Sequence, residues 1–282
     1  MTRWYQNVMG LSPQILADNL VWLSGSQRNL LLTRGTPGTL RFAAFSAHDD
    51  KHLKNIKAHL IAQKLHLKKL SSPLFKNSCF AFVDPDGNNI LLGLPKSLRG
   101  KPEILPGRLQ HVVFATNQLK RNVAFYTDTL GFKVSDIVRE DTTGEDTACF
   151  LRSDKMHHSI AFFRAPKAKL DHFANEADCW NDIRDWGDHF AANKVEIVWG
   201  AGRHGAGNNL FIFVRDPDGN SLEISAELEM LSYNQQPRIW SHGPRPLNLW
   251  DVPLAMTRSP LGVTISFSVH LLPALPPSIL PK

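Results

Sequence analysis

The amino-acid sequence predicts an α+β fold of two tandem modules, each a half-closed barrel of mixed sheet built from paired βαβββ units. The first observation is a repeat: a strand candidate, a DPDG turn and a second strand candidate recur as CFAFVDPDGNNILLG at residues 79–93 and LFIFVRDPDGNSLEIS at residues 210–225. The second observation is that helical segments are few, while strand candidates are short and alternating. Repetition of this size indicates two similar modules rather than one continuous domain.

Other paired segments place the remaining elements of each module. WYQNVMGL at residues 4–11 matches FYTDTLGF at residues 125–132, and each reads as the end of a helix, with an aromatic pair followed by a glycine that stops it. Each copy then has a strand candidate followed by an amphipathic helix. These pairs are residues 40–47 with 52–64 in the first copy, and residues 170–177 with 180–192 in the second.

We place the first module at residues 1–97 and the second module at residues 106–230. Pro95 to Pro106 joins them and is rich in proline, glycine and lysine, as linkers are. We expect residues 231–282 to form an irregular tail, because several prolines interrupt the segment and forbid long regular elements. A strap that packs back on the second module is expected from the apolar side chains Trp240, Leu247, Leu249 and Trp250.

The first module lacks its opening strand. The second module begins with the strand candidate LQHVVFAT at residues 109–116, ahead of its first helix, whereas the first module starts directly in the corresponding helix at Trp4 and Tyr5. Either the true start lies upstream or the module is incomplete. We favour the first explanation, because the loss of an interior strand would expose a sheet edge.

Composition excludes several classes of function. The net charge of +6 over 282 residues is mildly basic, but lysines and arginines are scattered among acids, which argues against a nucleic-acid partner. Residues 259–280 carry no charge, yet four prolines make a membrane helix unsuitable there, and the N-terminus has no apolar signal core. Cys79, Cys149 and Cys179 are far apart and odd in number, so we expect a reduced, cytoplasmic setting.

A metal site is predicted in the second module. On the strand at residues 220–226, Glu223 faces away from the apolar Leu222 and Ile224, a pattern that on its own is typical of the solvated face of a half-buried strand. Repeated units, however, place the strands that carry His111 and His172 around the same concavity. Two neutral imidazoles and one carboxylate leave part of a coordination sphere open, which suits non-haem Fe(II), equally Mn(II), and less naturally Zn(II).

The first module provides an internal comparison for this site. Phe42 falls at the position of His172 and Leu91 at the position of Glu223, while the strand that would supply the third ligand is missing. A coordinated change from ligands to apolar residues indicates one active module and one structural copy. We therefore expect no metal site in the first module.

The motifs LQHVVF, FYTDTLGF, MHHSIAFF, LDHFANE, GRHGAG and RDPDGNSLEI together resemble the type I extradiol ring-cleavage dioxygenases of the vicinal oxygen chelate superfamily, which includes glyoxalases and bleomycin resistance proteins. The resemblance covers the second module closely as far as Glu223 and the first module more loosely. It implies a mononuclear Fe(II), with Mn(II) possible, held by His111, His172 and Glu223. It also implies a catechol-type aromatic diol and O₂ as substrates, and assembly into a homo-oligomer.

The resemblance implies further site residues. His157 matches the acid–base histidine, with His158 as the alternative because neighbours on a strand face opposite ways. His204 matches the residue that hydrogen-bonds a diol oxygen. Many family members carry a tyrosine nine residues further on, where this sequence has Phe213, so a hydrogen bond worth about 1.5–3 kcal/mol is lost. Other residues considered for the substrate pocket are the polar Asn208 and Asn209 and the aromatic Phe162 and Phe211.

Two other functions compete with ring cleavage. A different metal-dependent enzyme of the same fold, such as a glyoxalase-like isomerase or a thiol transferase, would use a differently composed ligand set. A non-catalytic protein that binds an aromatic ligand would need no metal. Neither alternative requires the additional histidines His157 and His204.

Overall fold

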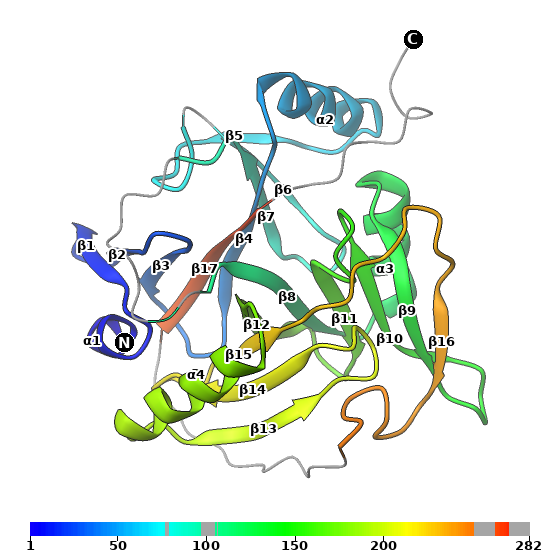
Figure 1. Cartoon of the computed structure of the whole chain (residues 1–282). Coiled ribbons are helices and arrows are strands. Elements are labelled where there is room, and N and C mark those ends of the chain that lie inside the picture. The colour runs from blue at the N-terminus through cyan, green and yellow to red at the C-terminus, as the bar shows by residue number, and fades with distance from the viewer. Residues whose placement is uncertain (77–78, 97–104, 106, 251–262, 271–282) are drawn as a thin grey trace.

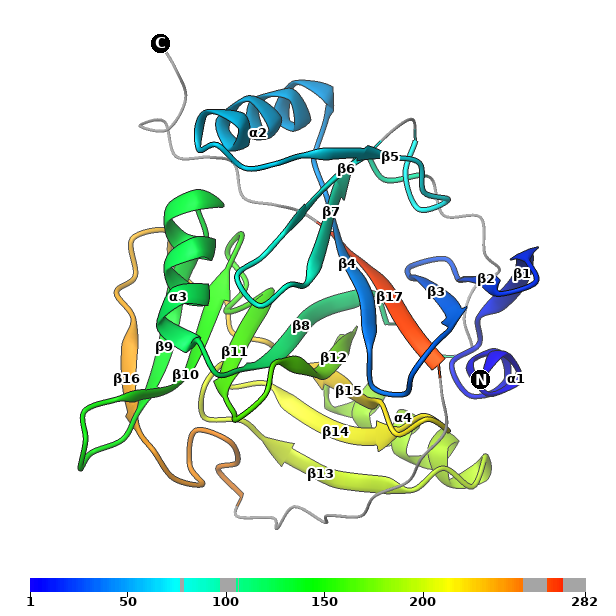
Figure 2. The same ribbon diagram turned by 180° about the vertical axis from the view of Figure 1, so that it is seen from behind.

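The structure is a computed structural model that describes residues 1–76, 79–96, 105 and 107–250, together with the backbone of residues 263–270. Two mixed sheets, one of eight strands and one of nine, carry most of the fold (Figure 1; Figure 2 shows the same ribbon from behind). The first sheet is formed mainly by the N-terminal third of the chain and the second by residues beyond 107. This arrangement confirms the predicted α+β class.

The second sheet contains two βαβββ units in sequence. The first unit consists of β8 (Leu109–Thr116), α3 (Leu119–Ala124) with the π-helical turn η1 (Phe125–Thr129), β9 (Lys133–Arg139), β10 (Asp146–Arg152) and β11 (Ile160–Arg164). The second unit consists of β12 (Lys169–Ala177), α4 (Trp180–Ala192), β13 (Ile197–Arg203), β14 (Leu210–Arg215) and β15 (Ser221–Ala226). The strand order is β13-β14-β15-β12-β8-β11-β10-β9-β16, so the opening strands β8 and β12 of the two units lie side by side at its centre.

The first sheet repeats this plan without an opening strand of its own. Its elements are α1 (Thr2–Asn7), β1 (Ser12–Ala17), β2 (Leu20–Ser24), β3 (Asn29–Arg34), β4 (Leu40–Ser46), α2 (Asp50–Ala62), β5 (Lys68–Leu70), β6 (Cys79–Val83) and β7 (Asn89–Gly93). The strand order is β1-β2-β3-β17-β4-β7-β6-β5. The linker expected at Pro95–Pro106 lies mostly outside the described residues.

The strand β17 (Val263–His270) occupies the place that β8 has in the second sheet. It lies between β3 and β4 in both ribbon views, antiparallel to β3 and parallel to β4 (Figures 1 and 2). The strand β8 is instead parallel to β11 and antiparallel to β12, so β17 runs in the opposite direction. A segment from the C-terminal region thus covers the edges that the missing opening strand would leave exposed.

The expectation of an irregular tail is wrong at two places. The strand β17 lies between Pro260 and Pro273, where the proline-free segment VTISFSVH alternates with the period of a strand. A second strand, β16 (Arg238–Ser241), pairs in parallel with β9. Prolines limit the length of regular elements but leave short strands free to form between them.

Local sequence explains the helix that supports the second unit. Along α4, Ile183, Trp186 and Phe190 recur at helical spacing and are buried on one face. The carboxylate of Asp182 accepts hydrogen bonds from the backbone N–H groups of Asp178 and Cys179 at the helix N-terminus. With its apolar face, α4 packs against β14 and β15 (Figure 1).

The register of the two sheets matches the positions compared in the sequence. Ala174 pairs with Glu223 between β12 and β15, and Ala44 pairs with Leu91 between β4 and β7. Phe42 lies two residues before Ala44, as His172 lies two residues before Ala174. In the first sheet these positions belong to an apolar cluster, with Phe42 packed against a core that includes Leu91.

The landmarks that reveal the repeat also join the two modules. Tyr5 Oη donates a hydrogen bond to Asp216 Oδ2 over 2.9 Å, and Tyr126 Oη donates to Asp84 Oδ2 over 3.2 Å. In each case the tyrosine of one module reaches the DPDG turn of the other, and all four residues are buried. One continuous hydrophobic core includes side chains of both modules. The site described below therefore lies in a frame fixed by reciprocal contacts.

The described part of the chain contains no helix that combines the length and the apolar character needed to cross a membrane.

Candidate metal centre

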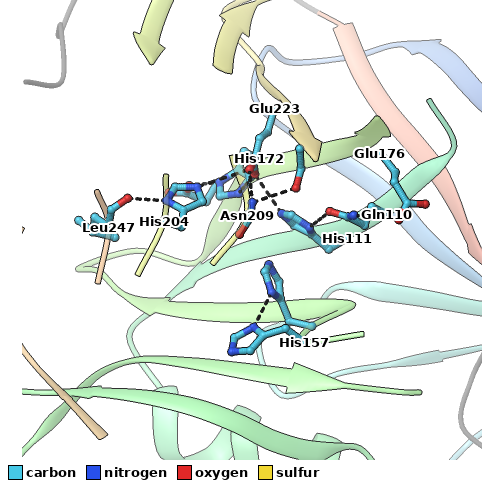
Figure 3. A network of polar contacts seen from close by, with 12 residues as sticks. Gln110, His111, His157, His172, Glu176, His204, Asn209, Glu223 and Leu247 are labelled. Carbon is cyan, nitrogen blue, oxygen red and sulfur yellow. Dashed lines mark hydrogen bonds and ion pairs between the residues drawn. The ribbon is translucent and has the colours of Figure 1, made fainter. Parts of the chain in front are cut away.

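Three side chains from adjacent strands meet in the second sheet. His111 lies on β8, His172 on β12 and Glu223 on β15, and their potential ligand atoms all lie within 4.8 Å of one another (Figure 3). The Glu223 Oε2 atom is 3.1 Å from His111 Nε2 and 3.4 Å from His172 Nε2. Each side chain is buried, so the cluster is shielded from bulk water. The structure thus brings together the three residues that the sequence predicts as metal ligands.

Neighbouring side chains determine which ring nitrogen of each histidine carries a proton. His111 Nδ1 is 3.1 Å from Gln110 Oε1, and the Gln110 amide Nε2 donates to Glu176. His172 Nδ1 is 2.7 Å from Asp171 Oδ1. Both partner oxygens only accept, so each histidine donates through Nδ1, and Nε2 is the nitrogen left for a metal.

The resulting donor set fits a divalent cation. Two imidazole lone pairs and a carboxylate oxygen that face one another repel unless they share a positive charge. Burial alone would raise the pKa of Glu223, but His111 and the hydrogen bonds of the surrounding histidines hold it well below its usual value, so the side chain is an anion. Burial lowers the pKa of His111 and keeps that imidazole neutral. A neutral imidazole and an ionised carboxylate are the protonation states that metal ligands require.

A pocket opens on this cluster. Its walls include the aromatic side chains of Phe150, Phe163, Trp199 and Phe213. The predicted strap covers one side with Pro246 and Leu247. A small, mostly apolar pocket with several imidazoles at its base is suited to a flat ring that bears polar oxygens.

His204 lies at the pocket as predicted from the GRHG motif. Its Nδ1 atom donates to the backbone carbonyl of Leu247, and its ring stacks on Phe211 with centroids 3.9 Å apart and an interplanar angle of 12° (Figure 3). Its Nε2 atom is 3.4 Å from Glu223 Oε1. The strap and the aromatic neighbour therefore hold this imidazole with Nε2 toward the metal cluster.

The structure favours His158 over His157 as the histidine of the pocket. His158 lines the pocket, and its ring centroid is 4.2 Å from that of His111. His157 lies on the far side of His111 from Glu223 (Figure 3). Its Nε2 atom contacts Asp136. Both histidines precede β11 in an irregular segment, where strand alternation gives no guide to their direction. The assignment of His157 to the pocket is corrected accordingly.

Three predictions about the substrate pocket also change. Asn209 is fully buried away from the pocket, where its Nδ2 atom donates to Glu223 Oε1 over 3.1 Å and to Ser225 Oγ over 2.8 Å. Phe162 belongs to the hydrophobic core. Asn208 contributes its carbonyl to Arg203 rather than a side chain to the pocket. Asn209 thus supports the carboxylate instead of facing the substrate.

Sequence reasoning did not identify the residues that contact the ligand histidines at Nδ1 or one aromatic residue of the pocket wall. Gln110 and Asp171 each directly precede a ligand histidine, and a hydrogen-bond acceptor at that position was the available signal. Trp199 reaches the pocket from β13, and its ring centroid is 5.2 Å from that of Phe213. No spacing in the sequence connects Trp199 with the site, because its position depends on the pairing of β13 with β14.

Comparisons with known proteins agree with this architecture. Residues 108–224 match the family model described as the Glyoxalase/Bleomycin resistance protein/Dioxygenase superfamily. Metapyrocatechase 2 of Cupriavidus necator is 30% identical over 177 residues, which cover 55% of this chain and 54% of the relative. The match thus spans about half the length of that relative.

A second relative matches over more of its length. The 3-methylcatechol 2,3-dioxygenase of Pseudomonas putida is 27% identical over 240 residues, which cover 76% of this chain and 81% of the relative. The crystal structure of the 2,3-dioxygenase LapB from Pseudomonas sp. KL28 superimposes with a TM-score of 0.73 at 22% identity, covering 85% of this chain and 91% of that one. This likeness shows the fold. Relatives include one enzyme named as an iron-dependent extradiol dioxygenase and one named as a manganese-dependent 2,3-dihydroxybiphenyl 1,2-dioxygenase.

Proposed function

We propose that this protein is an extradiol dioxygenase that cleaves the ring of a catechol-type aromatic diol with O₂. His111, His172 and Glu223 would hold a mononuclear Fe(II), and the same donor set would accept Mn(II). The observation that carries the proposal is the convergence of two imidazole Nε2 atoms and one ionised carboxylate at the base of an aromatic pocket. The dioxygenase relatives support it at the level of the family.

The ligand set leaves room for substrates. When bound, Fe(II) would supply Lewis acidity toward the diol oxygens and a redox-active centre for O₂. All three ligands approach from neighbouring strands of one sheet, so the pocket side of the site stays open for the diol. The aromatic walls would orient the ring and exclude water from it.

Two further histidines would handle protons and charge. His204 is held by the Leu247 carbonyl at Nδ1, so its Nε2 atom is the one that a diol oxygen can approach. His158 lines the pocket beside His111 and takes the acid–base role first assigned to His157. A glyoxalase-like isomerase or a protein that only binds an aromatic ligand requires neither histidine, and this pair therefore favours ring cleavage.

Phe213 should alter how the diol is bound. Its ring lines the pocket with its centroid 5.0 Å from that of His172, but it offers no hydroxyl to the substrate. The lost hydrogen bond would weaken binding of the diol rather than prevent turnover, since the imidazoles remain in place. We also propose a cytoplasmic setting, because Cys79, Cys149 and Cys179 are all free thiols. Assembly into a homo-oligomer stays a prediction.

Oxygen uptake tests the proposal. The protein is purified without air, loaded with Fe(II) and mixed with a panel of catechols in aerated buffer. We expect uptake of one O₂ per diol and a yellow ring-cleavage product, and we expect neither with His172→Ala. The exposed His66→Ala provides a matched control that should keep full activity. Absence of uptake with every diol by the iron-loaded wild type would contradict the proposal.

A further inference from the structure

A buried line of contacts runs from the pocket into the protein through two adjacent histidines. His158 Nδ1 is 2.9 Å from His157 Nδ1, and His157 Nε2 is 3.0 Å from Asp136 Oδ2. The exposed fractions are 3% for His158 and 0% for both His157 and Asp136, so water does not compete for these contacts. Each contact therefore needs one donor and one acceptor within the protein.

Asp136 can only accept hydrogen bonds at the inner end of this line. Arg238 donates to Oδ1 over 2.8 Å and to Oδ2 over 3.0 Å, and Trp240 Nε1 donates to Oδ2 over 2.9 Å. Burial alone would raise the pKa of Asp136, but the hydrogen bonds from His157, Arg238 and Trp240 hold it below its usual value. An ionised carboxylate requires that His157 Nε2 carry a proton.

The protonation of His157 fixes that of His158. If His157 carries a single proton, on Nε2, it has a lone pair at Nδ1, and His158 must donate to it through its own Nδ1. A cationic His157 would reverse this contact. With a neutral His157, His158 is left with a lone pair at Nε2. Among the described residues nothing forms a hydrogen bond with that Nε2 atom, and the side chain lines the pocket.

We propose that Asp136 and His157 are positioning residues that fix the tautomer of His158, leaving its Nε2 unprotonated and able to take a proton from a bound diol. The assignment of the tautomer depends on the buried contacts and on a neutral His157, and not on the proposed function. The consequence for the diol rests on the proposed function. In this arrangement His158 acts at the pocket, and His157 acts by fixing the tautomer of His158.

The surrounding backbone keeps His157 in place. Its N–H donates to the Glu229 carbonyl over 2.8 Å, and the Glu229 N–H donates to the Gly207 carbonyl over 2.9 Å. Gly207 has φ of +95°, and a Cβ atom there would lie 3.2 Å from His157 Nδ1. The strand β16 supplies both Arg238 and Trp240, which gives this part of the tail a role in the site.

Nitrogen chemical shifts test the tautomer without any turnover. Long-range ¹H–¹⁵N correlation spectra of metal-free protein labelled with ¹⁵N-histidine are recorded at pH 8, and His158 is assigned by its loss in His158→Gln. We expect a protonated Nδ1 and an unprotonated Nε2 in the wild type. His157→Phe, which keeps bulk but cannot accept a hydrogen bond, should populate the form protonated at Nε2. A wild-type His158 protonated at Nε2 would overturn the proposal.

Kinetics of the Fe(II)-loaded enzyme provide a second readout. His157→Phe should lower kcat about 10- to 100-fold, the range seen when a supporting hydrogen-bond partner is removed, with little change in KM or iron content. His157→Asn places an amide oxygen near the position of Nδ1 and should recover part of kcat. An unchanged kcat in His157→Phe would contradict the positioning role. If the wild type cleaves no diol, the proposed function fails, while the nitrogen spectrum still decides the tautomer.

Discussion

Metal affinity should depend steeply on pH, because a metal and a proton compete for the Nε2 atom of His172. Burial disfavours a charged imidazole, but the hydrogen bonds and charges of Asp171 and Glu223 raise the pKa of His172 to about 9. In the metal-free protein this imidazole is protonated at pH 7, and a divalent metal must displace the proton. The apparent affinity should therefore fall about 50-fold between pH 9 and pH 7, and level off above about pH 10.

The direction of the pH dependence follows from the direction in which folding shifts the pKa of His172. The pKa is raised from 6.5 to about 9 by folding, so protonation of His172 stabilises the metal-free protein fully below pH 6.5. That stabilisation is lost as the pH rises through about 9, where the lone pair becomes available to a metal. Metal binding and proton binding at this site thus have opposite pH dependences.

Electron paramagnetic resonance of free Mn(II) measures this affinity directly under argon between pH 6.5 and pH 9.5. Asp171→Asn weakens the 2.7 Å contact with His172 Nδ1 and should displace the pH dependence to lower pH. Asp185→Asn changes an exposed carboxylate on α4 and should leave it in place. Equal affinities at pH 7 and pH 9 in the wild type would refute the competition for His172.

Other predictions concern the pocket and the contact between the modules. Phe213→Tyr restores a hydroxyl at the pocket wall and should lower KM for catechols by a factor of about 10 or more, equivalent to a hydrogen bond of about 1.5–3 kcal/mol; an unchanged KM would show that the hydroxyl does not reach the diol. Tyr5→Phe should destabilise the protein by about 1–3 kcal/mol, because the buried Asp216 loses a donor. Tyr126→Phe should have a similar effect through Asp84, and calorimetry checks both against the exposed control Tyr233→Phe.

The sequence predicts the convergence of the three candidate ligands because the repeat defines which strands are equivalent. Once βαβββ units are recognised, the opening strands and the last strand must be neighbours, and the side-chain alternation places His111, His172 and Glu223 on one face. The same reasoning locates Phe42 and Leu91 in the first module. In these respects the local pattern and the global fold give the same answer.

Sequence reasoning fails where no regular period applies. His157 and His158 lie before β11 in an irregular segment, so which of them faces the pocket depends on the contact of His157 with Asp136, more than twenty residues away. Asn209 is a polar residue close in the chain to Phe213, which favours a place at the substrate, but its amide donates to Glu223. In both cases contacts between residues distant in the chain determine where the side chain points. Such contacts produce no regular spacing that a single sequence would reveal.

The C-terminal segment shows a different limit. The prolines on either side predict an irregular segment, whereas the alternating residues between them form β17. Its pairing with β3 and β4 depends on a vacant position in a distant sheet. A strand that is added from elsewhere in the chain is visible only when the whole sheet is assembled.

Metal stoichiometry measured by mass spectrometry after anaerobic loading with Fe(II) and removal of excess ion tests the central claim most directly. If His111, His172 and Glu223 share one ion, the wild type and His66→Ala should each retain one iron per chain, while His111→Ala, His172→Ala and Glu223→Ala should retain almost none. Retention of a full equivalent of iron by folded protein of all three ligand variants would contradict the claim, because the ion would then be bound somewhere else.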